Sequence, residues 1–419
     1  MWLRARVVWP VSCAPISDGA VCIEGNSITA VERWSDVSIS GSAVTDLGEV
    51  ILMPGLVNAH CHFDYTDFAG RISPAASFAQ WIRHIVALKA DFDDAAHWQS
   101  WLRGAAQCLA RGMTTVANIE TRRECLPGLW QQTPLRLRPF IEMILLRADS
   151  DADAALSEIL RWTNQNPLPR GDRLGISPHA PYTAKPDLLR RCAARLADGL
   201  PMTMHLVESA EEDDMFRNAR GPLYEMLADA GREMSDCGLG SAVLHADRCG
   251  ILNRGLIAVH CNYVDAADID LLAKRGVHVA HCPRSHSYFG HRPFPLDAMA
   301  KAGVNVCLGT DSLATVRGGA RVELDMFAEM RQFQRAHPET APTAIVHMAT
   351  LNAARALSLQ GCVGELAPQS WADLIALPFA GPLASVPDAV LCHAGPVRAV
   401  MLNGQWIWPS PSSAPVHAG

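Results

Sequence analysis

Apolar runs alternate regularly with amphipathic stretches through the middle of this 419-residue chain, and this alternation constrains its fold most strongly. Apolar residues at three- and four-residue spacing predict helices over 185–196, 266–274 and 295–302. Strands that alternate with helices form parallel sheets, and eight such units close into a (β/α)8 TIM barrel, the α/β architecture that we predict. The expected strands, in chain order, are 52–59, 114–119, 137–141, 174–178, 202–206, 256–259, 277–280 and 304–308.

The two ends of the chain follow a different pattern, in which short apolar runs are joined by tight turns. Gly25-Asn26 near the N-terminus and Asn403-Gly404 near the C-terminus are typical of hairpin turns. We therefore expect residues 1–53 and 362–410 to pair into one small β-sandwich domain, with the barrel over 54–361. The end of the Pro/Ser-rich tail, residues 411–419, is predicted to be disordered.

Charge and composition exclude several classes of protein. The net charge of -7 gives no electrostatic reason to expect a nucleic acid or an anionic membrane as partner. No apolar stretch reaches the length that spans a bilayer, and residues 1–11 lack the long apolar core of a signal peptide. The 13 cysteines are odd in number and form no Cys-x-x-Cys pair, which favours reduced thiols in a cytoplasm. We expect a small-molecule substrate, and a homodimer is left open as the assembly.

The tripeptide His60-Cys61-His62 follows the first predicted strand. Because side chains alternate along a strand, both imidazoles point to the same side and make half of a divalent metal site. The alternative is a pair of packed or solvated histidines. Cys61 lies between them, so it is expected to point away from the site as a packed thiol.

Further polar residues end other predicted strands, and they decide between these interpretations. In a parallel barrel the active site lies at the C-terminal ends of the strands. His179, His205, His260 and Asp311 all fall at such ends, which favours a metal centre. The strand that ends at His179 carries no lysine to bridge two metals, so one ion is expected. The ligands that suit Zn²⁺, or Fe²⁺ as the alternative, with one position open for water, are His60, His62, His205 and Asp311.

The same rim offers groups for acid–base chemistry. A bound metal lowers the pKa of its water toward about 7. Asp311 can accept the proton of that water, and His260 can hydrogen-bond the hydroxide or polarise the group under attack. Glu208, three residues beyond His205, is placed to protonate a ring nitrogen. Glu142 faces the pocket or pairs with an arginine.

A second group of histidines surrounds the seventh predicted strand. These residues are His281, His286 and His291. The cluster packs the loop, contacts substrate or binds a second metal. We carry His286 forward as a candidate substrate contact.

Six motifs resemble, as a set, the amidohydrolase superfamily and specifically its branch of chlorohydrolases and aminohydrolases: MPGLVNAHCH (53–62), SPHAPYT (177–183), MHLVES (204–209), VHC (259–261), HCP (281–283) and GTDS (309–312). The resemblance covers nearly the whole chain, and segment 77–82 is similar to the family segment after strand 1. Carried over motif by motif, it implies the metal ligands His60, His62, His205 and Asp311, the proton shuttle Glu208, the hydroxide partner His260, and the substrate contacts His179 and Trp81.

The resemblance also implies an activity, because this branch includes S-adenosylhomocysteine/methylthioadenosine, aminodeoxyfutalosine, guanine and cytosine deaminases. We expect hydrolytic deamination of an adenine-type nucleoside derivative with release of ammonia. Where adenosylhomocysteine deaminases carry a ribose-binding glutamate, this chain has Ala87-Leu88-Lys89-Ala90, and it looks closer to aminodeoxyfutalosine deaminases. Guanine or cytosine deamination, triazine dechlorination and cyclic amide hydrolysis are the alternatives. A non-catalytic metal-binding scaffold is disfavoured because both Glu208 and Asp311 are present.

Overall fold

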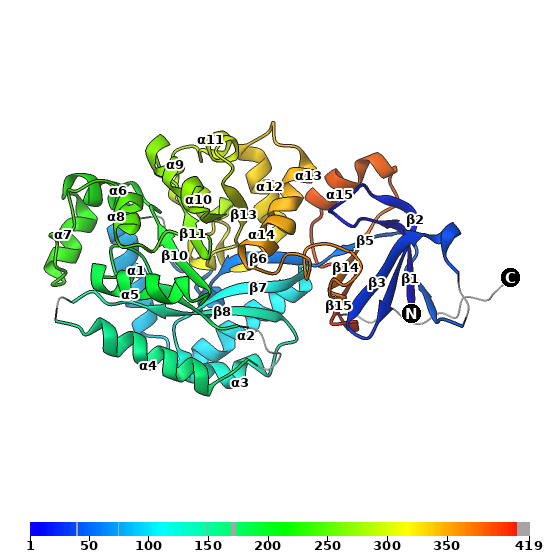
Figure 1. The fold of residues 1–419 in the computed structure, drawn as a ribbon, viewed down its shortest axis with the longest axis horizontal. Helices are drawn as coiled ribbons and strands as arrows, with labels where there is room; N and C mark the ends of the chain where they lie inside the picture. The colour runs from blue at the N-terminus through cyan, green and yellow to red at the C-terminus, as the bar shows by residue number, and fades with distance from the viewer. Residues whose placement is uncertain (39–40, 74, 148, 169–172, 409–419) are drawn as a thin grey trace.

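The middle of the chain forms the predicted parallel barrel in the computed structural model, which describes residues 1–38, 41–73, 75–147, 149–168 and 173–408 (Figure 1). Within these residues, eight hydrogen-bonded strands follow the chain order around the barrel, and a bridge between Cys61 and Asp311 joins the first strand to the end of the last. The predicted fold class is confirmed. The strands are β6 (Leu56–Cys61), β7 (Met113–Glu120), β8 (Arg136–Met143), β9 (Gly175–Pro178), β10 (Met202–Leu206), β11 (Leu256–His260), β12 (His278–His281) and β13 (Asn305–Leu308).

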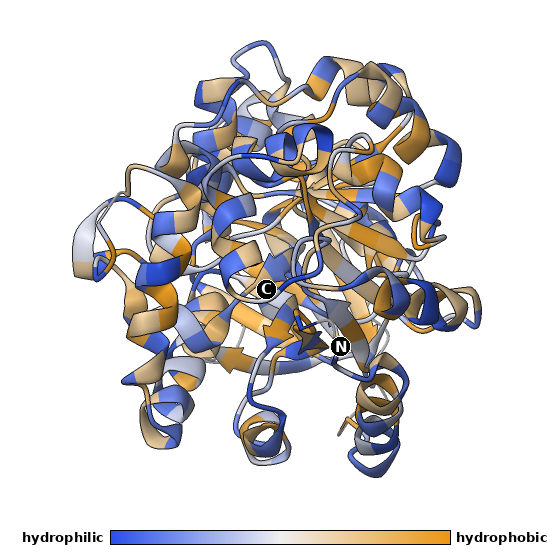
Figure 2. Cartoon of the chain, turned by 90° about the vertical axis from the view of Figure 1, so that its left-hand side faces the viewer, coloured by the Kyte–Doolittle hydropathy of each residue, from blue (hydrophilic) through white to orange (hydrophobic). Residues whose placement is uncertain are grey.

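Helices lie around the barrel, and the strands at its centre are mostly hydrophobic while the helices carry residues of both kinds (Figures 1 and 2). The helices predicted over 185–196, 266–274 and 295–302 are present as α5, α9 and α11. The helices are α1 (Phe78–Ala90), α2 (Asp94–Ala110), α3 (Leu126–Trp130), α4 (Ala152–Gln165), α5 (Pro186–Ala197), α6 (Ala210–Asn218), α7 (Pro222–Asp229), α8 (Ala242–Arg248), α9 (Ala266–Arg275), α10 (Pro283–Phe289), α11 (Leu296–Lys301), α12 (Met326–Ala336), α13 (Pro342–Met348), α14 (Leu351–Ala356) and α15 (Val386–Leu391).

The two chain ends build a second sheet beside the barrel, as the hairpin patterns predicted (Figure 1). Strand β5 of the N-terminal part pairs with β14 of the C-terminal part, so both ends share one hydrogen-bonded layer. Its apolar core includes Leu3, Val21, Leu374 and Met401. The strands are β1 (Trp2–Val8), β2 (Ile16–Glu24), β3 (Ser27–Arg33), β4 (Val44–Asp46), β5 (Val50–Pro54), β14 (Leu374–Pro378), β15 (Ala399–Leu402) and β16 (Gln405–Trp408). The tail predicted to be disordered, 411–419, lies outside the described residues.

The first barrel strand differs from its prediction over 52–59. The structure divides that run into β5, which belongs to the terminal sheet, and β6, which opens the barrel. Gly55 is the single residue between them, and its N–H donates to the carbonyl of Asp373 at 3.0 Å. A Cβ at this position would lie 2.1 Å from Oγ1 of Thr114, so only glycine lets the chain cross here.

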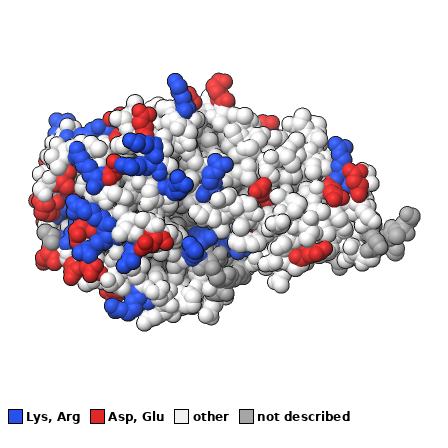
Figure 3. Space-filling view, in the orientation of Figure 1, with Lys and Arg blue, Asp and Glu red and all other residues white. Residues whose placement is uncertain are grey.

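Charged residues of both signs are interspersed over the barrel on the face seen in Figure 3. In the described part of the chain, no helix has both the length and the apolar character that crossing a bilayer requires. The mixture of charges on this face agrees with the small net charge of the sequence.

Candidate metal centre and active site

The C-terminal rim of the barrel brings together side chains from four strands. His60, His62 and Asp311 form one group whose ligand atoms all lie within 4.8 Å of one another, and His60, His205 and His260 form another. Oδ1 of Asp311 lies 3.6 Å from Nε2 of His60 and 3.7 Å from Nε2 of His62. All five residues are at least 95% buried. The candidate ligands predicted from strand ends therefore converge.

Strand β13 reaches the His60 region because of a glycine. A Cβ on Gly309 would lie 2.8 Å from Cβ of His60 and 2.9 Å from its carbonyl oxygen. The backbone N–H groups of Thr310 and Asp311 donate to that same oxygen at 3.0 and 3.1 Å. Asp311 then adopts a left-handed conformation, with φ of 54°, which turns the chain after the strand.

Asn58 links the same two strands through its side chain and was not singled out in the sequence. Its Oδ1 accepts the N–H of Thr310 at 3.1 Å, and its Nδ2 donates to Oγ1 of Thr310 at 2.8 Å. Its Oδ1 also accepts the N–H of His60 at 3.3 Å. Because Asn58 is fully buried, these bonds fix the spacing between the His60 and Asp311 backbones.

The ring nitrogens of these histidines have the state that a divalent cation needs. Both nitrogens of His60 and Nε2 of His260 are buried without a hydrogen-bond partner among the described residues. Burial lowers the pKa of His62 and His260 well below their usual value and that of His205 to about 4. Unpaired buried polar atoms are costly, and neutral imidazoles are metal ligands. The donor set therefore fits Zn²⁺ or a similar ion.

Two neighbours complete this electrostatic arrangement. The carbonyl of His179 lies 2.9 Å from Nδ1 of His205, which leaves Nε2 of His205 directed to the cluster. Burial raises the pKa of Asp311, but the surrounding His60, His260 and His62 outweigh it, so the pKa lies well below its usual range. Asp311 is consequently a carboxylate beside neutral imidazoles.

Glu208 faces the same cluster but differs in protonation. Its Oε1 lies 3.6 Å from Nε2 of His260, and both residues are buried. Burial, together with Asp311 and Glu212 nearby, raises the pKa of Glu208 well above its usual value. Burial therefore favours the protonated form of Glu208, whereas its histidine neighbours favour the ionised form of Asp311. Two carboxyl groups whose pKa values are pushed apart are the arrangement expected of a proton donor and a proton acceptor.

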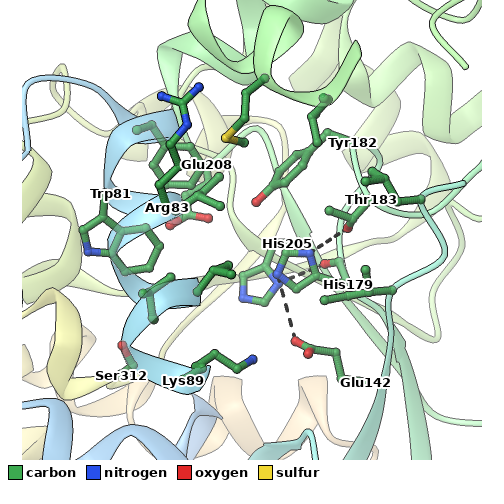
Figure 4. Close-up of a pocket in the computed structure, with 18 of the residues that line it drawn as sticks. Trp81, Arg83, Lys89, Glu142, His179, Tyr182, Thr183, His205, Glu208 and Ser312 are labelled. Carbon is green, nitrogen blue, oxygen red and sulfur yellow. Dashed lines mark hydrogen bonds and ion pairs between the residues drawn. The ribbon is translucent and has the colours of Figure 1, made fainter. Parts of the chain in front are cut away.

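A cavity of about 430 Å³ opens above these groups, and Figure 4 shows several of the side chains that line it. Of the predicted substrate contacts, Trp81, Glu142 and His179 line it. Oε1 of Glu142 lies 4.0 Å from Nε2 of His179, whose Nδ1 lies 2.7 Å from Oγ1 of Thr183. Glu142 thus faces the pocket, one of the two orientations that the sequence left open.

Lys89 and the apolar mouth of the cavity were not predicted. Lys89 of α1 points its amine toward Glu142 (Figure 4). Burial raises the pKa of Glu142 to about 7, while the charge of Lys89 lowers it. Away from the metal-site residues, the wall is mostly apolar but includes the exposed Arg83, and Val86 and Ile144 are 59% and 53% exposed. The other apolar residues of this mouth are Ile82, Leu146, Met226 and Leu227.

His286, the fourth predicted substrate contact, does not line this cavity. It lies on α10 and lines a separate hollow together with His281 and His291. Its Nε2 lies 2.8 Å from the carbonyl of Arg292, and its ring stacks on His291. The short helix α10 turns the side chain toward its own loop, so His286 packs this segment. Among described residues, no ligand group for a second metal is found in this cluster.

Comparison with known proteins agrees with this architecture. The model of the Amidohydrolase family matches residues 51–407. The chain belongs to the amidohydrolase family. It is therefore a hydrolase that acts on carbon–nitrogen bonds, as the sequence motifs predicted. The match spans the four candidate ligands and His260, the whole barrel, and the C-terminal strands of the second sheet, but not strands β1 to β4.

This amidohydrolase is similar to several characterised members. The 5-methylthioadenosine/S-adenosylhomocysteine deaminase of Syntrophobacter fumaroxidans is 30% identical over 384 residues, which cover 87% of this chain and 81% of that protein. An adenosine deaminase from Xanthomonas campestris, solved with bound zinc, is 25% identical, with a TM-score of 0.79 over 97% of this chain and 92% of that one. Helicobacter pylori aminofutalosine deaminase, solved with methylthio-coformycin, is 18% identical with a TM-score of 0.85, covering 97% and 99%, and shows the shared fold.

Proposed function

We propose that this amidohydrolase is a metal-dependent deaminase of adenine-type nucleosides that releases ammonia. The observation that carries the proposal is the convergence of Glu208, Asp311 and the histidine cluster at the floor of one cavity, where the pKa of Glu208 is raised by burial and that of Asp311 is lowered by the histidines. Deamination needs this combination, because a ring nitrogen must be protonated while water is deprotonated. The similarity to deaminases named for methylthioadenosine and adenosine supports the adenine-type substrate.

His60, His62, His205 and Asp311 are proposed to hold one divalent ion, with Zn²⁺ preferred and Fe²⁺ as the alternative. Three imidazoles and one carboxylate make the donor set, and the zinc in the similar Xanthomonas campestris structure supports the choice. When bound, the ion supplies a water molecule whose pKa falls toward about 7. The unpaired nitrogens of His60 are the feature that this ion would satisfy.

Glu208, Asp311 and His260 are proposed to move the protons. Glu208 donates its proton to a ring nitrogen, which makes the adjacent amino-bearing carbon electrophilic. Asp311 accepts one proton of the attacking water and passes it to the amine, which leaves as ammonia, and the remaining hydroxyl proton returns to Glu208 as the ring carbonyl forms. His260, within 3.6 Å of Glu208, hydrogen-bonds the attacking oxygen and holds it in line with the ring. Positioning and proton transfer together supply the acceleration.

The apolar mouth favours methylthioadenosine over S-adenosylhomocysteine as substrate. A nucleoside whose base sits at the metal end directs its 5′ substituent toward Val86, Ile144 and Met226. A methylthio group gains free energy when it packs against these apolar side chains, whereas they offer no hydrogen bond to the charged amino acid of homocysteine, whose carboxylate has Arg83 as the nearby basic group. The sugar is proposed to contact three polar side chains that line the same cavity and offer hydrogen-bond acceptors and a donor: Glu142, Lys89 and His179. Trp81 is proposed to contact the base or sugar from α1.

The discriminating experiment is ammonia release across a panel of methylthioadenosine, S-adenosylhomocysteine, adenosine, aminodeoxyfutalosine, guanine and cytosine. We expect the highest kcat/KM for methylthioadenosine. Preference for guanine or cytosine would replace the nucleoside proposal with a base deaminase, and chloride release from a triazine would replace deamination. Absence of any turnover by zinc-loaded protein would leave a metal-binding scaffold.

We also propose that the protein works in a reducing cytoplasm on a small-molecule substrate. All of its cysteines are free thiols in the structure, and most of them are buried. The homodimer stays a prediction, which sedimentation of the purified protein would test.

A further inference from the structure

Glu208 occupies the cavity only because the chain leaves the regular strand geometry directly before it. Side chains alternate along a strand, so residues three apart, such as His205 and Glu208, would face opposite sides. Val207 interrupts this alternation with φ of 51°, a left-handed conformation that is strained for a β-branched residue. As a result, His205 and Glu208 both line the same cavity.

Two buried side chains hold the peptide groups of Glu208 in this conformation. Oε2 of Glu212 accepts the backbone N–H of Glu208 at 2.9 Å. Nδ2 of Asn262 donates to the backbone carbonyl of Glu208 at 2.9 Å. Glu212 and Asn262 are 0% and 1% exposed, so neither bond competes with bulk water. The backbone of Glu208 is therefore hydrogen-bonded on both sides by side chains from two different segments, α6 and the loop after β11.

Glu212 and Asn262 are themselves held by backbone hydrogen bonds. The N–H of Glu212 donates to Oγ of Ser209, which caps α6, at 3.1 Å. The N–H of Asn262 donates to the carbonyl of Val207 at 3.0 Å. Oε1 of Glu212 and Oδ1 of Asn262 have no hydrogen-bond partner among the described residues, so the polar contacts of these side chains are with the backbone of Glu208 and, for Glu212, also with that of Val207. Buried groups left partly unpaired are costly, and such sites are usually functional.

We propose that Glu212 and Asn262 are positioning residues that hold Glu208 against the ring nitrogen of the substrate. This inference rests on the proposed proton-donating role of Glu208. A helix cap alone would explain the contact of Glu212, but it does not explain Asn262, which lies outside α6 and binds the opposite side of the same residue. Strain at Val207 would otherwise relax and withdraw the Glu208 carboxyl from the cavity.

The test compares variants that keep or remove each hydrogen bond. Glu212→Met and Asn262→Leu preserve side-chain volume but remove the acceptor or the donor, and each should lower kcat by about 100-fold, the cost of a misplaced catalytic group. KM and metal content should change little. Glu212→Gln keeps an acceptor and should retain most of the activity, because burial already raises the pKa of Glu212 to about 8.

Coupling to Glu208 separates positioning from general damage. If Glu212 acts through Glu208, the double variant Glu208→Gln/Glu212→Met should be no slower than Glu208→Gln alone. Asp268→Ala is the matched control, because Asp268 is buried and caps the neighbouring helix α9 from the same N3 position. This control should lose stability but leave kcat unchanged. Multiplicative losses in the double variant, or full activity of both Glu212→Met and Asn262→Leu, would overturn the proposal.

Hydrogen exchange makes the test independent of catalysis. The backbone amide of Glu208 should exchange faster in Glu212→Met, and also in Asn262→Leu, than in the parent protein, while the amides of β11 stay protected. If the parent protein fails to deaminate any nucleoside, the proposed function fails. The exchange measurement still reports whether Glu212 and Asn262 hold the backbone of Glu208. If Glu212→Met does not fold, Asn262→Leu tests the same residue from the other side. Unchanged exchange at Glu208 in the variants that fold would contradict the inference.

Discussion

The floor and the mouth of the cavity are built on different principles. The floor consists of strand ends with buried histidines and carboxyl groups, held by Gly309, Asn58 and backbone bonds between strands. The mouth consists of helix and loop side chains such as Val86 and Ile144, which are more than half exposed. Rigid strand ends fix the reacting groups, whereas helices added above the rim choose what reaches them. Changes at the floor should therefore act on kcat, and changes at the mouth on KM.

Removal of the metal should have the largest effect and tests the floor as a whole. Without the ion, the pKa of the attacking water returns from about 7 to about 15.7, so deamination should fall below detection. Chelation followed by metal analysis and an ammonia assay measures this. One equivalent of Zn²⁺ should restore turnover. Undiminished activity in demonstrably metal-free protein would contradict the proposed role of His60, His62, His205 and Asp311.

Glu208→Gln should have the next largest effect, because it removes the proposed proton donor and keeps its shape. We expect kcat to fall by about 10² to 10⁴, the usual contribution of a positioned acid. Metal content, measured on the same preparation, should remain one ion per chain. Glu225→Gln, an exposed position on α7, is the control and should behave like the parent protein. Normal turnover of Glu208→Gln would remove this residue from the mechanism.

Ile144→Arg sharpens the comparison from the side of the mouth. A charged guanidinium in place of the apolar Ile144 removes a contact of the methylthio group and should raise the KM for methylthioadenosine about tenfold, or about 1.4 kcal/mol, while kcat stays the same. The KM for S-adenosylhomocysteine should rise less, because its carboxylate gains a partner. Leu239→Arg is the matched control, since Leu239 is 58% exposed but does not line the cavity. A loss confined to kcat would break the division between floor and mouth.

Lys89→Met should have the smallest effect and appears in the pH dependence of KM. Burial raises the pKa of Glu142 to about 7, and Lys89 opposes this shift by favouring the charged carboxylate. We expect KM to change in a single step over the pH range in which Glu142 titrates. Loss of Lys89 raises the pKa of Glu142 further, so this step in KM should move to higher pH. Glu142→Gln should abolish the step, and Lys274→Met, at an exposed position on α9, should leave it in place. A step that moves to lower pH in Lys89→Met would refute the assignment.

Strand ends were the part of the site most accessible from sequence. His60, His62, His205, His260 and Asp311 each follow an apolar run, and the barrel topology places all such ends at one rim. Glu208 was also expected there. The left-handed conformation of Val207 was not predicted, because a single sequence carries no signal for the backbone conformation of one β-branched residue.

Contacts between distant segments could not be predicted in the same way. Asn58 becomes important through Thr310, 252 positions away, and nothing in its neighbourhood in the sequence indicates this pairing. His286 was expected near the substrate because it follows a strand end, whereas helix α10 places it in a separate hollow, and its contact with substrate stays a prediction. The division of the first strand at Gly55 depends on Thr114, which again is a tertiary contact.

The single-residue joint at Gly55 gives the terminal sheet a mechanical influence on the chemistry. Strand β5 is anchored between β1 and β14, and β6 begins immediately after the joint and carries His60 toward the rim. Because a single residue joins the two strands, a shift of the terminal sheet should also displace His60 and His62. We expect calorimetry to show one cooperative melting transition for both parts, and added zinc to shift the melting of the distant terminal sheet as well as that of the barrel.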